Sequence, residues 1–269
     1  GTGDGGSGDS ADGGSPETCT FGTRTLIAPL MSAGEDYDVG IRHDGTTLAF
    51  ASNRTVDFVI YSSVNSAGTW SSPTVEPVLD STSPETSPTW NYDGTELYFT
   101  SSRTGPSLTY VASYTAGGFG TPTLAPGLEA IEILNITLSR DGLELFGTVP
   151  PFPTRIVRAV RATRTAPWQV VDDVPELDDP AANDGWAGLS PDALTIYFES
   201  NRSTSASIWS ATRAVVGGSF TTPEPVAELN APQNTESDPE VSFDGSLIYF
   251  GGSSVSGDHD VYTAPRICN

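Results

Sequence analysis

Acidic side chains recur at one position of a repeating pattern in this chain of 269 residues. An Asp followed by Gly or Ala returns about every 50 residues, and eight positions before it stand Asp36, Glu85, Asp184 and Glu236, with Ile133 in the fifth case. Oxygen ligands without a neighbouring His or Cys favour Ca²⁺ or Mg²⁺ over zinc. We therefore expect these four residues to form a weak Ca²⁺ or Mg²⁺ site, or a docking point for a Lys or Arg of a partner. The alternative is that they accept hydrogen bonds from loop amides.

A second set of residues stands two positions closer to each turn. It comprises Asp38, Ser87, Asn135, Trp186 and Asp238. Near-symmetric sets suit the binding of an ion or a partner better than hydrolysis, because hydrolysis needs two carboxylates in different environments. Trp186 is the one large aromatic residue of the set, which makes it a candidate contact for a sugar or a partner, or a packing residue.

The two histidines offer little support for catalysis. His43 adjoins the first turn and is expected to be a turn residue, whereas His259 lies between Asp258 and Asp260, where it would assist a metal or simply belong to a loop. The chain has no Gly-x-Ser-x-Gly motif, so we discard a Ser/His/Asp hydrolase. We assign no catalytic residue.

The elements that position these residues follow from the same repeat. An apolar segment precedes each turn and a segment rich in Tyr and Phe follows it, which predicts a β-hairpin. A third strand comes next, and a fourth opens near an aromatic residue at Phe21, Trp70, Phe119, Trp168 and Phe220. Four strands in about 50 residues are typical of a propeller blade. We expect an all-β, five-bladed β-propeller in which each blade has four strands, formed by residues 19–269 as a single domain.

The ends of the chain must meet within one blade. The sequence begins with a fourth strand and ends on a third, so the N-terminal strand should complete the last blade. Cys19 and Cys268 are the only cysteines, and aligning the last blade on the first places them at neighbouring positions. We expect a disulfide between them and an oxidising compartment.

Charge and composition exclude several classes of partner. The chain has 34 acidic and 12 basic residues and a net charge of −22, which repels nucleic acid and anionic membranes. No apolar run is long enough to span a membrane. Residues 1–18 are rich in Gly, Ser and Asp, which predicts a flexible tail similar to the tether of bacterial lipoproteins. The alternative is a tail that contacts a neighbouring subunit.

The repeat resembles a known family. The segments SPDALTIYFESNR (190–202) and SFDGSLIYFGG (242–252) are similar to the WD40-like PD40 repeats of the TolB family of β-propellers. The resemblance covers residues 20–267 and implies a periplasmic or surface protein that binds other proteins, usually without catalytic residues.

We therefore expect a secreted, periplasmic or cell-surface bacterial propeller that is not an enzyme and serves as a protein-binding or assembly module. One alternative is a cation-binding surface protein that self-associates through its N-terminal tail. The other is a carbohydrate-active propeller enzyme that acts on a glycan through paired carboxylates.

Overall fold

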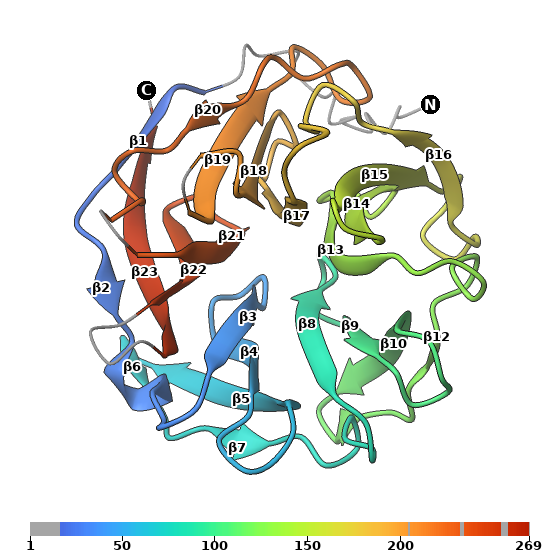
Figure 1. Cartoon of the computed structure of the whole chain (residues 1–269). Coiled ribbons are helices and arrows are strands. Elements are labelled where there is room, and N and C mark those ends of the chain that lie inside the picture. Colours follow the sequence, from blue (N-terminus) through green and yellow to red (C-terminus); the bar gives the residue numbers. More distant parts are fainter. Residues whose placement is uncertain (1–16, 204, 232–233, 254–257, 269) are drawn as a thin grey trace, which may run out of the picture.

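The computed structural model describes residues 17–203, 205–231, 234–253 and 258–268. Five antiparallel sheets are arranged around a central axis (Figure 1). The predicted all-β, five-bladed β-propeller is therefore confirmed. The predicted tail lies almost entirely outside the described residues.

Each blade runs outward from the axis in chain order. The innermost strands are β3 (Asp36–Ile41), β8 (Glu85–Trp90), β13 (Leu134–Leu138), β17 (Asp184–Leu189) and β21 (Glu236–Val241). The second strands are β4 (Thr47–Ser52), β9 (Glu96–Ser101), β14 (Glu144–Val149), β18 (Thr195–Ser200) and β22 (Leu247–Ser253). The third strands are β5 (Val59–Ser66), β10 (Leu108–Thr115), β15 (Arg155–Val160), β19 (Ser207–Thr212) and β23 (His259–Cys268).

The outer edges are short and irregular. They consist of β6 (Thr69–Trp70) with β7 (Thr74–Val75), β11 (Gly118–Phe119) with β12 (Thr123–Leu124), β16 (Gln169–Asp173), and β20 (Glu224–Pro225). In the last blade the edge is formed by β1 (Cys19–Phe21) and β2 (Thr25–Leu26), which both pair with β23. A 3₁₀ turn, η1 (Ala28–Leu30), leads into the first blade. None of the described helices is long and apolar enough to cross a membrane.

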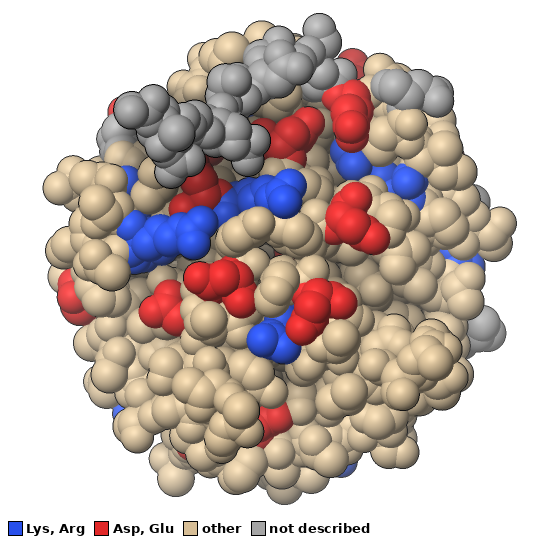
Figure 2. Space-filling model, turned by 180° about the vertical axis from the view of Figure 1, so that it is seen from behind, with Lys and Arg blue, Asp and Glu red and all other residues tan. Residues whose placement is uncertain are grey.

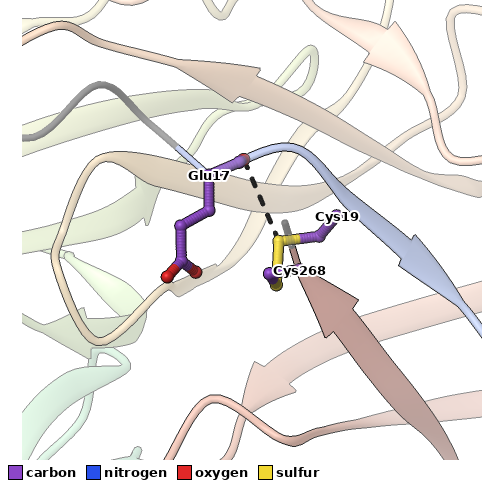
Figure 3. A group of neighbouring side chains, drawn as sticks. All are labelled: Glu17, Cys19 and Cys268. Atoms are coloured by element: carbon purple, nitrogen blue, oxygen red, sulfur yellow. Dashed lines mark hydrogen bonds between the residues drawn. A yellow bond between two sulfur atoms is a disulfide. The ribbon is translucent and has the colours of Figure 1, made fainter.

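The expected disulfide closes the propeller. Cys19 and Cys268 face each other directly in the β1–β23 pairing, and their sulfur atoms are bonded across a sequence separation of 249 residues (Figure 3). In the chain-entropy model, closing so long a loop stabilises the fold by about 5–6 kcal/mol. The bond thus replaces the peptide link that this blade lacks.

The hydrophobic core is divided among the blade interfaces. Five clusters of buried side chains each join residues of neighbouring blades. One example packs Phe50 on Tyr61, with Ile27 and Tyr249 in the same cluster. Because no blade buries both faces by itself, the ring positions the innermost strands only when all the blades are present.

Candidate functional site

The carboxylates at the start of the innermost strands are all neutralised by arginine. We call Asp36, Glu85, Asp184 and Glu236 the strand-start carboxylates; each has an exposed fraction of 0%. Their oxygens lie 2.7, 3.1, 2.6 and 2.7 Å from guanidinium nitrogens of Arg54, Arg103, Arg202 and Arg24 respectively. Each carboxylate is therefore half of a buried ion pair within its own blade.

Aromatic rings hold each of these arginines in place. Arg202 lies 5.3 Å from the ring centre of Phe198 and 5.1 Å from that of Trp209, and it also donates to the Leu177 carbonyl. The equivalent pairs of rings are Phe50 with Tyr61, Phe99 with Tyr110, and Phe250 with Tyr262. Acid, arginine and two rings thus form one packing unit that is repeated in four blades.

The third blade lacks every member of this packing unit at the equivalent positions. Ile133 replaces the acid, Gly147 replaces the Phe of the second strand, and Pro151 stands where three of the other blades have the arginine. A Cβ on Gly147 would lie 2.4 Å from the Ile133 side chain, so the isoleucine fills the place of the missing ring. The structure does not bring the strand-start carboxylates together. Among the described residues, the only three metal-ligating groups that converge are Glu17 with Cys19 and Cys268, whose sulfurs are bonded to each other.

The second set of residues lines the axis itself. Asp38, Ser87, Asn135, Trp186 and Asp238, which we call the axial residues, have φ values of +55°, +53°, +50°, +48° and +51°. Each sits at a register shift between the first and second strands of its blade. They line a cavity of about 30 Å³, the axial cavity, together with residues such as Thr89 and Glu240. The left-handed backbone is unusual for a bulky residue such as Trp186 and marks this layer as a functional candidate.

Two axial carboxyl groups contact each other. Asp38 and Asp238 are joined by a side-chain hydrogen bond, and burial together with the charge of Asp238 raises the pKa of Asp38 well above its usual value. Burial raises the pKa of Asp238 as well, so the two carboxyl groups share a proton. The Ser87 amide and hydroxyl lie 2.9 and 3.1 Å from Asp38 Oδ2 and hold this carboxyl group in place.

A larger pocket adjoins the axial cavity and shares Trp186 and Asp238 with it. This mouth pocket has a volume of about 310 Å³ and is lined by Tyr37, Trp186, Glu199, Ala206, Thr235, Ser237, Asp238 and His259. Burial, and secondarily the charge of Asp238, raises the pKa of Glu199 well above its usual value. Two aromatic side chains and two carboxyl groups therefore share one small space, and no Lys or Arg lines it.

His259 is held at the edge of the mouth pocket by neighbours on both sides. Its Nδ1 lies 2.9 Å from a Glu35 carboxylate oxygen, and its Nε2 lies 2.8 Å from the Thr235 hydroxyl. Because the carboxylate only accepts hydrogen bonds, Nδ1 carries a proton and donates it to Glu35. His43, in contrast, lies beside its turn as expected, and its ring contacts Phe243 edge-on at a centroid distance of 6.0 Å.

Arginine side chains are all engaged elsewhere in the fold. The twelve basic residues are all arginines, and each has an ion pair or an aromatic contact. Figure 2 shows basic side chains lying beside acidic ones around the centre of the ring. Because the arginines already have partners in the fold, the excess of acidic side chains is what attracts an incoming ligand.

Comparison with known proteins supports the fold alone. No family model matches the chain, and a search of curated proteins finds no match. Among solved structures, a putative TolB from Agrobacterium tumefaciens is 15% identical, with a TM-score of 0.56 over 94% of this chain and 99% of that one. An endo-arabinase from Bacteroides thetaiotaomicron is 13% identical, with a TM-score of 0.59 over 91% and 97%. A gluconolactonase from Xanthomonas campestris is 13% identical, with a TM-score of 0.55 over 94% and 97%.

These similarities correct one expectation. Several of the similar structures are enzymes: the arabinase, a family-43 glycoside hydrolase, the gluconolactonase and an oligogalacturonate lyase. The conclusion from the repeat that the chain is not an enzyme is therefore wrong as it stood, because this architecture carries catalytic sites as well as binding sites.

Proposed function

We propose that this protein is an exported propeller that binds a partner protein by taking one of its Lys or Arg side chains into the mouth pocket. The observation that carries the proposal is the lining of the pocket, where Glu199 and Asp238 face the same space as Tyr37 and Trp186 and no Lys or Arg is present. Carboxyl groups and aromatic faces are the two groups that attract an ammonium or guanidinium ion.

The electrostatics of the pocket favour a cationic ligand over a neutral one. Burial and the proximity of Asp238 raise the pKa of Glu199, so the empty pocket disfavours a second negative charge. A bound cation offsets the cost of ionising Glu199 and therefore favours its charged form. The net charge of −22 adds long-range attraction for a basic partner.

The size of the pocket also fits a single side chain. A volume of about 310 Å³ is at the small end of ligand sites, and it accommodates the end of an inserted side chain better than a large cofactor. Tyr37 is fixed by a ring contact with Phe58 at a centroid distance of 5.0 Å, so one wall of the pocket is preformed.

Export is part of the proposal and is supported by the disulfide. A bond between Cys19 and Cys268 persists in an oxidising compartment such as the periplasm or the cell exterior. The similarity in fold to a TolB protein agrees with a role at the bacterial envelope.

The test uses a blocked Gly-Gly-Lys-Gly-Gly peptide and its Lys→Gln counterpart, titrated calorimetrically at physiological salt. The Lys peptide should bind at one site per chain. The Gln peptide should bind at least tenfold more weakly than the Lys peptide. Glu199→Gln and Trp186→Ala should each weaken the Lys peptide at least tenfold. Glu228→Gln is the matched control, because it removes one negative charge from an exposed residue outside the pocket. Equal binding of both peptides, or no heat with either, would contradict the proposal.

We propose glycoside hydrolysis as a second function, because the carboxyl groups around the mouth pocket have unequal environments. Burial and the charge of Asp238 raise the pKa of Glu199, whereas hydrogen bonds to Asp238 oppose the effect of burial on its pKa. A neutral acid beside a carboxylate is the arrangement that glycosidases use, and Trp186 offers a face for a sugar. Release of nitrophenol from a panel of nitrophenyl pentosides and hexosides should be lost in Glu199→Gln. The absence of release from every substrate would contradict this second function.

A further inference from the structure

The axial cavity adjoins the mouth pocket and shares Trp186 and Asp238 with it, but its other lining residues take no part in the proposed partner contact. Residues from the innermost strands of all five blades line it, and its volume of about 30 Å³ holds one or two water-sized species. This is the space of a single ion rather than of an organic ligand.

The polar groups that line the cavity all offer oxygen atoms. Asp38, Asp238 and Glu240 contribute carboxyl groups, Asn135 an amide, and Ser87 and Thr89 hydroxyl groups. Neither His, Lys nor Arg is among the lining residues. Several oxygen ligands on separate elements match the preference of Ca²⁺, which takes six to eight oxygens in flexible geometry.

Two of these oxygens are buried and, apart from the proton that the two carboxyl groups share, have no hydrogen-bond partner. They are Asp38 Oδ1 and Asp238 Oδ1, and Asp38 is only 5% exposed. A buried carboxylate oxygen without a partner is costly, and natural proteins rarely leave one so. The Ser87 amide donates to Asp38 Oδ2, so Oδ1 is the oxygen that is left for the shared proton or for an ion.

We propose that the axial cavity binds one divalent cation, with Ca²⁺ as the preferred ion, through the carboxylates of Asp38 and Asp238 and the neutral oxygens of Ser87 and Asn135. The ion replaces the proton that the two carboxyl groups share. Glu240 lines the same cavity and supplies a further carboxyl group. The ion would supply the positive counter-charge at the axis, as arginine does for the strand-start carboxylates.

The charge balance favours a divalent ion over a monovalent one. Two carboxylates in contact repel each other when both are ionised, and a single proton offsets only one charge. A divalent cation offsets both. Binding should therefore release about one proton per ion and weaken as the pH falls.

The test is calorimetric titration of CaCl₂ into chelator-treated protein at pH 7, in two buffers with different ionisation enthalpies. We expect one Ca²⁺ per chain, release of about one proton, and a higher melting temperature in the presence of Ca²⁺. Asp38→Asn and Asp238→Asn should each weaken binding at least tenfold. Asparagine tolerates the left-handed backbone of these positions, so both variants should fold. Glu228→Gln should bind as the parent does.

A second readout keeps the proposal testable if a variant folds poorly. Tb³⁺ in the axial cavity should show luminescence sensitised by tryptophan, because Trp186 lines the same cavity. Excess Ca²⁺ should displace this signal, and Trp186→Phe should reduce it. Absence of binding heat and of a melting shift in the parent, or unchanged binding in the Asp38→Asn/Asp238→Asn double variant, would overturn the proposal. The mouth-pocket peptide test needs no cation, so the two proposals fail separately.

Discussion

The strand-start carboxylates and the axial carboxyl groups lie two residues apart on the same innermost strands, yet their environments are opposite. Asp36 has the Arg54 guanidinium at 2.7 Å, whereas Asp38 has the carboxyl group of another acid. The first arrangement completes the packing of a blade and supplies the counter-charge within the fold. Asp36 Oδ2 and Glu236 Oε2 are also buried without a hydrogen-bond partner, so the axial carboxyl groups differ in having no arginine beside them. A carboxylate is thus a candidate for binding only where the fold has not already supplied its counter-charge.

The largest expected effect comes from breaking a strand-start ion pair. Arg202→Met should reduce the free energy of unfolding by about 3–5 kcal/mol, because it leaves Asp184 buried without its counter-charge. The matched control is Arg155→Met, whose partner Asp173 is 58% exposed; that change should cost at most about 1 kcal/mol. Urea denaturation of both variants measures the difference. Similar losses in the two would mean that burial does not separate these pairs.

The next largest effect is a dependence of stability on pH that arises at the axis. Burial raises the pKa of Glu240 to about 8. The folded chain therefore keeps a proton that the unfolded chain loses above about pH 4.5, and stability should fall as the pH rises from about 4.5 to 8, by at most about 1.4 kcal/mol per pH unit. Asp38, Asp238 and Glu199 act in the same direction, since burial also raises their pKa values.

Glu240→Gln isolates the contribution of this one group. The variant should lose less stability than the parent between pH 5 and pH 8 in urea denaturation without divalent cations. Asp244 is the contrasting case, because the Ser246 amide lowers its pKa and its contribution is lost only as the pH falls through the acid range. An unchanged pH slope in Glu240→Gln would show that the axial carboxyl group is solvated rather than buried.

The smallest effect tests the backbone of the axial residues. Trp186→Asn should raise the free energy of unfolding by about 1 kcal/mol, because Asn tolerates φ of +48° better than Trp does. The same change should weaken binding of the Lys peptide at the mouth pocket. A gain in stability together with a loss of peptide binding would show that Trp186 serves binding and is not needed for packing. A clear loss of stability would instead make Trp186 a packing residue.

The sequence predicted the fold well because the fold follows from a local pattern. The spacing of Asp44 and its four counterparts indicated five hairpins, and the positions of Cys19 and Cys268 indicated how the last blade closes. Both inferences depend only on the spacing of the repeats along the chain, and that spacing is nearly the same where individual side chains differ between blades.

The chemistry of the site was harder to predict from sequence. The four acids were recognised, but not the arginines that neutralise them, although an arginine follows the second strand in three of those blades and both are missing where Ile133 stands. In the last blade the partner is Arg24, which is 212 residues away from Glu236 and had no signal in the repeat. The residue types of Glu199, Tyr37 and Glu240 do not recur at the equivalent positions of the other blades. Only the structure places Glu199 and Tyr37 in the mouth pocket and Glu240 in the axial cavity.

The most direct test of the central claim is to remove one charge from each set and compare the two losses. Asp184→Asn and Asp238→Asn should be unfolded with urea at pH 7.5 in the presence of a chelator. We expect Asp184→Asn to lose about 3–5 kcal/mol of unfolding free energy, because Arg202 is left buried without its partner. Asp238→Asn should lose nothing or gain stability, because it removes one of two buried carboxyl groups in contact. Comparable losses in both variants would contradict the claim that only the axial carboxyl groups lack a counter-charge.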